Sequence, residues 1–334
     1  MAIQAHAETV DRRWDAYDFF GYLIPGAVAV LSAALVVTTY HQLGFGQALA
    51  AVMSTGWDVL LVGGLFVVFV SYVAGHLVAT VSAFLYDRTF VQQVFDYPYK
   101  TLFFSGAKKK RNITRDYYRG ILTFGYFSAV IFVLDPHRSI QNIPLWMGPL
   151  GAIVLLFGVH ESFYHLRKYD RLVGVIGGAF FVVSIPFRLA ENLIRKHIGL
   201  DTPFTDEFKE KFGAEFEALF GCPLSEKTGT DVYWLTYVYV TERSEFIRRT
   251  LVKFLILYSY LRNLSAALLI SSLVLGWGAT AYPGGTHLGI AAIGALAIGI
   301  VLSIRYYYIY LNYYSKLIFR SFLALRAMDG SASK

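Results

Sequence analysis

The chain has 334 residues, of which 56% are hydrophobic and only 16% are charged. A soluble domain usually carries about a quarter charged residues, so this composition argues against a water-soluble protein and favours a membrane protein. Cys222 is the only cysteine, which excludes an intrachain disulfide and a cysteine-rich metal site. The net charge of +7 is informative mainly through where the basic residues lie.

The first hydrophobic run covers Phe19–Tyr40 and is predicted to cross a membrane. A helix of that length measures about 33 Å, which is enough to cross the hydrocarbon core. The residues before it mix acidic and basic side chains, without the basic start and cleavage site of a secretory signal. We therefore expect the run to be retained as the first span.

Pro25 and Gly26 lie inside this run. The part after them is too short to span, so the helix is predicted to begin near Asp18, as an N-cap residue, and to pass through the proline. Proline frees the carbonyl of Gly21 and kinks the helix. In a membrane such a carbonyl must find a partner or line a wet cavity. The kink therefore either fits the packing of the helices, or it acts as a hinge or exposes a carbonyl that lines a transport pathway.

The second run, residues 59–80, contains His76 well inside it and is followed by Asp87. Tyr72, His76 and Thr80 share one helix face. Ionisable groups inside a membrane are functional candidates. A neutral histidine bonded to a neighbouring helix explains the residue equally well.

A basic segment, residues 89–119, follows the second run. It contains the densest charge cluster of the chain, formed by Lys108, Lys109, Lys110 and Arg111. Such a cluster acts as an orientation signal, or it binds anionic lipid headgroups or an acidic partner. No nucleic-acid partner is expected, because no recognisable nucleic-acid-binding fold surrounds the cluster.

Residues 120–188 hold three more hydrophobic runs. Those at 120–134 and 145–159 are predicted spans, although each is short. The run at 172–187 is flanked by basic residues on both sides and is predicted to be re-entrant or interfacial. The prediction is six spans, with four as the alternative. His160 and His165 are five residues apart, not four as in the helical metal motif, so no metal is expected.

Residues 189–250 are predicted to form a cytoplasmic helical region. Its phenylalanines recur at helical spacing up to Gly221, a natural helix stop: Phe204, Phe208, Phe212, Phe216 and Phe220. This stripe packs either on its own domain or membrane, or in a partner's groove. The next stretch, 231–246, is predicted to be a helix that Asp231 could cap and that runs on into the following span. Its β-branched and aromatic residues leave a strand as the alternative.

The last region, 251–334, contains two predicted spans at 264–281 and 288–304. Arg262 opens the first at the same membrane boundary as Asp87, so an ion pair between them is expected; a snorkelling arginine is the alternative. Six tyrosines between Tyr306 and Tyr314 are typical of an interfacial aromatic belt. They are also placed to pack a helical extension beneath the membrane.

The basic residues define an orientation. With the N-terminus inside, every Lys and Arg except Arg138 lies on the cytoplasmic side, as the positive-inside rule requires. Both termini are then cytoplasmic. The predicted fold is an all-α integral membrane protein of five regions: 1–88, 89–119, 120–188, 189–250 and 251–334.

Four stretches carry a resemblance: YDFFGYLIPG, GHLVATVSAFLYDR, FDYPYKTLF and LRNLSAALL. Together they resemble a group of uncharacterised bacterial multi-span inner-membrane proteins. The resemblance implies two membrane hairpins around a cytoplasmic region and no established activity. Some members of that group accompany defence modules.

The sequence thus predicts a non-catalytic inner-membrane protein without cofactors. It is expected to act by homo-oligomerisation or by binding a cytoplasmic partner, as a regulated pore or defence-type effector. One alternative is a transporter or channel with Pro25, His76 and Arg262 near its path. Another is a lipid-modifying enzyme that uses His76 or His160 as a base.

Overall fold

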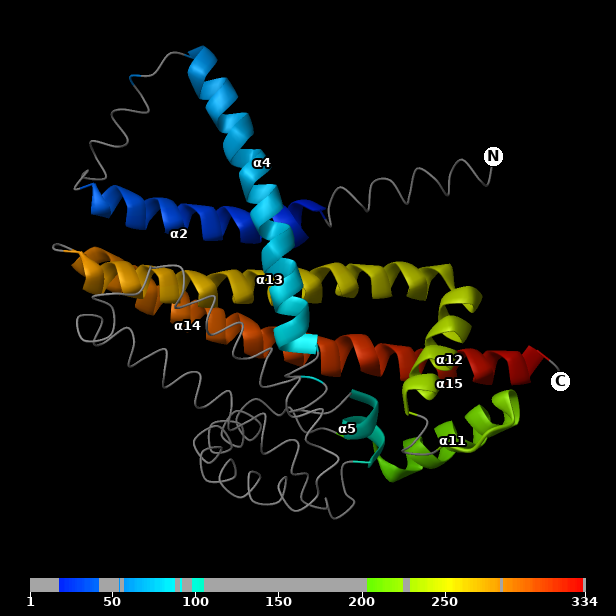
Figure 1. Cartoon of the computed structure of the whole chain (residues 1–334). Helices are drawn as coiled ribbons and strands as arrows, with labels where there is room; N and C mark the ends of the chain where they lie inside the picture. Colours follow the sequence, from blue (N-terminus) through cyan, green and yellow to red (C-terminus); the bar gives the residue numbers. More distant parts are fainter. Residues whose placement is uncertain are drawn as a thin grey trace, which may run out of the picture.

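The structure is a computed structural model that describes residues 18–41, 54, 57–87, 91, 98–104, 203–224, 229–282 and 285–332. Every regular element in these residues is a helix (Figure 1). The elements are η1 (Phe19–Leu23), α2 (Ile24–Tyr40), α4 (Trp57–Ser82), α5 (Pro98–Phe104), α11 (Asp206–Phe220), α12 (Gly229–Arg243), α13 (Glu245–Ala281), α14 (Thr286–Tyr308), η4 (Ile309–Ser315) and α15 (Lys316–Ala332).

Four helical stretches are long and apolar enough to cross a membrane: Phe19–Tyr40, Leu61–Asp87, Glu245–Ala281 and Thr286–Asp329. This confirms the predicted all-α class and four of the six predicted spans as membrane-compatible helices. The runs at 120–134, 145–159 and 172–187 lie outside the described residues, so the six-span count stays a prediction.

Three of these helices run alongside one another. α13 and α14 form an antiparallel hairpin, and α2 lies along α13 (Figure 1). At the closed end of the hairpin Gly278 faces Leu288 and Val36, so that a Cβ on this glycine would press against both side chains. Small residues permit this close approach of membrane helices. α4 crosses the other helices steeply instead of running beside them.

The last two long helices are longer than the core of a membrane is thick. α13 has 37 residues, which makes it about 55 Å long, and the hydrocarbon core is about 30 Å thick. α14, η4 and α15 follow one another without a break from Thr286 to Ala332. Both helical paths are therefore longer than a bilayer core is thick, which leaves room for the predicted helical extension.

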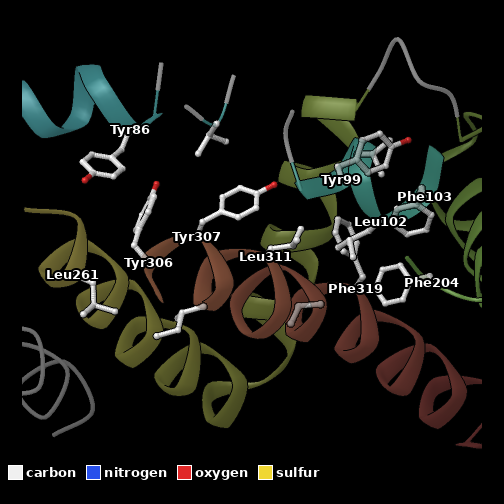
Figure 2. Close-up of a cluster of buried hydrophobic side chains, with 14 of the residues drawn as sticks. Tyr86, Tyr99, Leu102, Phe103, Phe204, Leu261, Tyr306, Tyr307, Leu311 and Phe319 are labelled. Carbon is white, nitrogen blue, oxygen red and sulfur yellow. The ribbon is translucent and has the colours of Figure 1, made fainter. Parts of the chain in front are cut away.

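Outside the bundle these helices meet α5, α11 and α12, and together they form what we call the extramembrane module. Phe212 and Phe216 of α11 are fully buried. Their rings lie 5.0 Å and 6.4 Å from that of Phe322 in α15, and Phe319 packs beside Phe103 and Phe204 (Figure 2). The phenylalanine stripe therefore packs on its own chain, which confirms the first of the two interpretations.

The ends of α11 follow from its sequence. The Thr205 hydroxyl accepts a hydrogen bond from the Phe208 amide at 3.3 Å, an N-cap of the usual kind. Gly221 ends the helix at φ 70°, a left-handed conformation that glycine adopts without steric cost.

The stretch after it is helical, as predicted, but α12 does not continue into α13. Ser244 has extended backbone between them, and its hydroxyl accepts from the Ile247 amide at 3.4 Å, so it caps α13. A serine side chain that satisfies the first amides of a new helix favours a break at this position. Asp231 lies inside the first turn of α12 and not before it, so its predicted role as the cap was wrong.

The tyrosines near the end of α14 also differ from expectation. Tyr306 and Tyr314 are buried, and with Tyr310 they stack at four-residue spacing while all three contact Tyr258 of α13. The belt interpretation is wrong for these two buried residues, which join two helices. A further tyrosine, Tyr233 of α12, lies close to Tyr314. Burial and the nearby Tyr314 raise the pKa of Tyr233 well above its ordinary value, so this phenol stays protonated.

Candidate functional site

Asn263 of α13 is fully buried, and it bonds to two other segments of the chain and to its neighbour Arg262. Its Nδ2 donates to the Gly21 carbonyl at 2.8 Å. Its Oδ1 accepts from the Ser82 hydroxyl at 2.5 Å and from Arg262 Nε at 3.2 Å. In the α-helical register Gly21 carries the carbonyl that the missing N–H of Pro25 would have bonded. The predicted need for a partner is therefore met by a side chain and not by a wet cavity.

Asp87 and Arg262 form the ion pair that the sequence predicts. Tyr306 of α14 adds a second bond, since its hydroxyl donates to Asp87 Oδ1 at 2.8 Å. The arginine side chain is 11% exposed and the aspartate 41% exposed. The carboxylate thus receives a charged and a neutral donor at the edge of the bundle.

Tyr86 extends the same set of contacts. The Ser265 hydroxyl donates to the Tyr86 hydroxyl at 2.8 Å, and the Tyr86 hydroxyl lies 2.5 Å from Ser303 Oγ. Its ring also packs edge-on against Tyr306 at 5.4 Å (Figure 2). Phenols suit this position because the ring is apolar and the hydroxyl can still be bonded.

These contacts form one unit, which we call the polar network. Its members are Gly21, Ser82, Tyr86, Asp87, Arg262, Asn263, Ser265, Ser303 and Tyr306. It joins all four membrane-compatible helices at the end where each meets the predicted cytoplasmic boundary. Buried polar groups are costly when they lose a partner, so the network fixes how the four helices sit together.

Pro25 and Gly26 lie next to this network. The helix is π-helical from Phe19 to Leu23 and α-helical from Ile24, so the change of helix type directly precedes the proline. Helicity starts at Asp18 as predicted, but this side chain makes no capping hydrogen bond, so the N-cap prediction was wrong.

Gly26 has a separate role in packing. A Cβ on Gly26 would overlap the backbone of Ser71 and Gly75, and one on Gly75 would overlap the Tyr22 backbone. These glycines let η1 and α2 touch α4 backbone to backbone.

His76 lies close to this crossing, and within the described part of the chain its side chain makes no hydrogen bond to the network. Its ring stacks on Tyr22 at 4.0 Å and meets Tyr72 edge-on at 4.6 Å. Its carbonyl accepts from the Thr80 hydroxyl at 3.0 Å. The histidine side chain is exposed, and its participation in any mechanism stays a prediction.

The basic cluster Lys108, Lys109, Lys110 and Arg111 lies outside the described residues, as does His160. Among the residues that the structure does describe, no group of three or more His, Cys, Asp and Glu side chains could hold a metal ion. Comparisons with protein-family models, with curated proteins and with solved structures gave no match.

Sequence reasoning found the ion pair but missed most of the polar network. Ser82, Tyr86, Ser265 and Ser303 are small or aromatic polar residues of a kind common in membrane helices, and nothing in their local sequence marks them. Asn263 did carry a signal: it lies at the same predicted depth as the carbonyl that Pro25 frees.

Proposed function

We propose that this chain is a non-catalytic membrane protein in which the extramembrane module controls the arrangement of the membrane helices, as in a regulated pore or defence-type effector. One observation carries the proposal. α13 and the continuous path α14–η4–α15 are shared by the bundle and the module. A change in the module therefore reaches the bundle through rigid helices.

The polar network is the control point in this proposal. It lies where the shared helices leave the bundle. Each of its buried hydrogen bonds joins two specific groups, so a bond is either formed or broken. A packed arrangement of this kind changes between distinct states and does not deform gradually. Loss of one bond would leave other buried groups unpaired, which gives the arrangement its energetic barrier.

Packing continues from the network into the module without an interruption. Tyr86 and Tyr306 of the network belong to the same buried cluster as Phe103, Phe212 and Phe319 (Figure 2). Packed side chains that form one contiguous cluster are a physical route for coupling between two regions.

The module offers an exposed apolar surface for a protein partner. Trp234, Val238 and Phe246 are exposed by 56%, 53% and 79%. Aromatic anchors on a water-facing surface are typical of protein–protein contacts. Two further partners are proposed. One is a second copy of the chain, and the other is the anionic lipid headgroups that Lys108–Arg111 would contact, which follows from charge alone.

The proposed location is the bacterial inner membrane, with both termini in the cytoplasm. The distribution of Lys and Arg and the sequence resemblance support it. Cys222 is exposed in the module and provides the test. A membrane-impermeant maleimide should label it in broken cells and leave it unlabelled in intact spheroplasts, whereas labelling in intact spheroplasts would reverse the orientation.

The two alternative functions receive less support. A transport path near Pro25 would use the freed carbonyl of Gly21, which Asn263 already binds. A lipid-modifying enzyme would use His76 or His160 as its base. The His76 ring is packed against Tyr22 and Tyr72, and His160 lies outside the described residues.

Permeability of liposomes tests the proposal. The double variant Asp87→Asn/Arg262→Gln removes both charges of the pair together, and Ser272→Ala is the matched control because its hydroxyl bonds only the Leu269 carbonyl of its own helix. We expect tight liposomes with the wild type and the control, and dye leakage with the double variant. Equal tightness of all three, with normal insertion, would contradict a pore controlled by the polar network.

A further inference from the structure

The two halves of α4 have different surroundings. The second half crosses η1, α2 and α13 and ends in the polar network. The first half stands clear of the bundle (Figure 1). Leu65, Phe66 and Phe69 are exposed by 71%, 66% and 63%, and a Cβ on Gly63 or Gly64 would meet no atom within 4 Å.

The crossing point lies between these halves. Gly26 meets Ser71 and Gly75, and Gly75 meets the backbone of Tyr22. Twelve residues, about 18 Å, separate Gly75 from Asp87, and ten residues, about 15 Å, separate Ser71 from Leu61. The stretch Leu61–Asp87 is one unbroken helix without proline, and it is π-helical only from residue 83 to residue 87. Between residues 64 and 82 it has neither a proline nor a π-helical turn, two of the usual causes of a sharp kink. This part of the helix therefore resembles a rigid rod that is crossed near its middle.

If the pairing of α2 with α4 at the crossing is extended away from the polar network, two small residues come to lie opposite each other. Tyr22 lies opposite Gly75 and Gly26 opposite Ser71. Seven residues further along α2 is Ala33, and seven residues earlier along α4 is Gly64. Both are exposed, and both lie on the faces that already touch at the crossing. Small residues at such a spacing allow two membrane helices to approach closely.

We propose that α4 is a two-position lever that turns about the Gly26–Gly75 contact. In the position that the structure describes, the polar network holds its second half and its first half is free. In the other position the first half packs along α2, with Gly64 against Ala33. Because the helix is rigid, its second half then leaves α13 and α14. The proposal rests on the proposed function and names the moving part that the polar network controls.

Five contacts must be lost when the lever turns: Asp87–Arg262, Asp87–Tyr306, Ser82–Asn263, Tyr86–Ser265 and Tyr86–Ser303. In return α4 gains only van der Waals contacts with α2, because lipid chains already surround its apolar side chains. The network therefore favours the described position, and weakening the network should favour the other.

Disulfide trapping tests the lever. The lone native thiol is removed by Cys222→Ser, and Ala33→Cys with Gly64→Cys places two thiols at the predicted contact. In liposomes under a mild oxidant we expect little intramolecular disulfide when the network is intact. Adding Asp87→Asn/Arg262→Gln should raise the cross-linked fraction by about fivefold or more, the size of a modest coupling between two sites.

Two matched pairs control the measurement. Leu31→Cys with Gly64→Cys moves one thiol to another face of α2 and should stay unlinked in both backgrounds. Thr39→Cys with His287→Cys joins α2 to α14, where Thr39 Oγ1 and His287 Nε2 lie 3.2 Å apart. Because the imidazole is longer than a cysteine side chain, this pair is joined with a short bifunctional maleimide, and its cross-linked fraction should be the same in both backgrounds since it does not involve α4.

A second readout covers variants that insert poorly. Nitroxide labels at Val37→Cys and Leu61→Cys, both exposed by more than half, should move closer when the network is broken. Efficient cross-linking with an intact network would show that α4 bends, and it would overturn the lever. The absence of cross-linking and of any distance change in both backgrounds would also overturn it, as would cross-linking only between two copies.

The lever and the proposed function can fail separately. Leakage from the network-broken variant without approach of residues 33 and 64 would remove the lever and leave a network-controlled pore. Approach without leakage would support the lever and remove the pore.

Discussion

The Asn263 side-chain amide donates to the Gly21 carbonyl at 2.8 Å, across two helices and deep in the protein. The bond explains how a proline is tolerated inside a predicted membrane span, since the carbonyl it frees is bonded again by a neighbouring helix. It also explains why a polar side chain lies fully buried in α13.

Loss of this amide should destabilise the protein. Asn263→Ala removes the side-chain donor to the Gly21 carbonyl, at a cost of about 2 kcal/mol, while the Ser82 hydroxyl keeps its bond to the Ala79 carbonyl at 2.8 Å. Thermal unfolding in detergent, followed by intrinsic fluorescence, measures the change. Ser272→Ala in the same helix should be nearly neutral, because its hydroxyl bonds only its own helix. Equal effects of the two variants would mean that the Asn263 bond contributes little.

Pro25→Ala should rescue part of that loss. The new N–H at position 25 can donate to the Gly21 carbonyl as in an ordinary helix. The cost of Asn263→Ala should therefore fall by about 1 kcal/mol in this background, as a double-mutant cycle would show. Strict additivity of the two substitutions would indicate that Asn263 and Pro25 act independently.

The Asp87–Arg262 ion pair should contribute more to the free energy of unfolding than the hydrogen bond from Tyr306 to Asp87. Asp87→Asn leaves a mostly buried arginine without its counter-charge, at a cost of about 2 kcal/mol, between values typical of exposed and of buried pairs. Tyr306→Phe removes only the bond to Asp87 and should cost about 1 kcal/mol. Unfolding by heat in low and high salt distinguishes them, because salt should weaken only the charged contribution. A larger loss for Tyr306→Phe would contradict this order.

The glycine crossing provides a matched pair in one helix. Gly75→Ala should disturb α4 strongly, since its Cβ would overlap the Tyr22 backbone. Gly64→Ala meets open space, and alanine favours helix by up to about 1 kcal/mol, so stability should be unchanged or raised. Yield of folded protein after gel filtration and thermal unfolding measure both. Tolerance of Gly75→Ala would show that the two backbones are not in contact.

The phenylalanine core of the module predicts another contrast. Phe212 is fully buried and Phe246 is 79% exposed. Phe212→Ala should cost about 3–5 kcal/mol through lost burial and the cavity left behind, whereas Phe246→Ala should be nearly neutral. Limited proteolysis of α11 and α12 in detergent follows the loss. Similar proteolysis of both variants would contradict the packing of α11.

The sequence predicted features that depend on local pattern. The phenylalanine stripe and its end at Gly221 follow from helical spacing and a known stop residue. Asp87 and Arg262 were paired because both lie at one membrane boundary. The contacts of Tyr258 could not be derived in this way, because they depend on which faces of α13 and α14 meet. The packing of Tyr306, Tyr310 and Tyr314 was predicted beside the aromatic belt, but their common partner Tyr258 was not.

Hydrogen exchange in liposomes tests the central claim most directly, because it compares the module in a protein with an intact polar network and in one without it. Asn263→Ala should speed amide exchange in α12, in α15 and in the first turns of α13, far from the substitution, while Ser272→Ala should leave these segments unchanged. Faster exchange confined to the turns next to residue 263 would contradict coupling between the network and the extramembrane module.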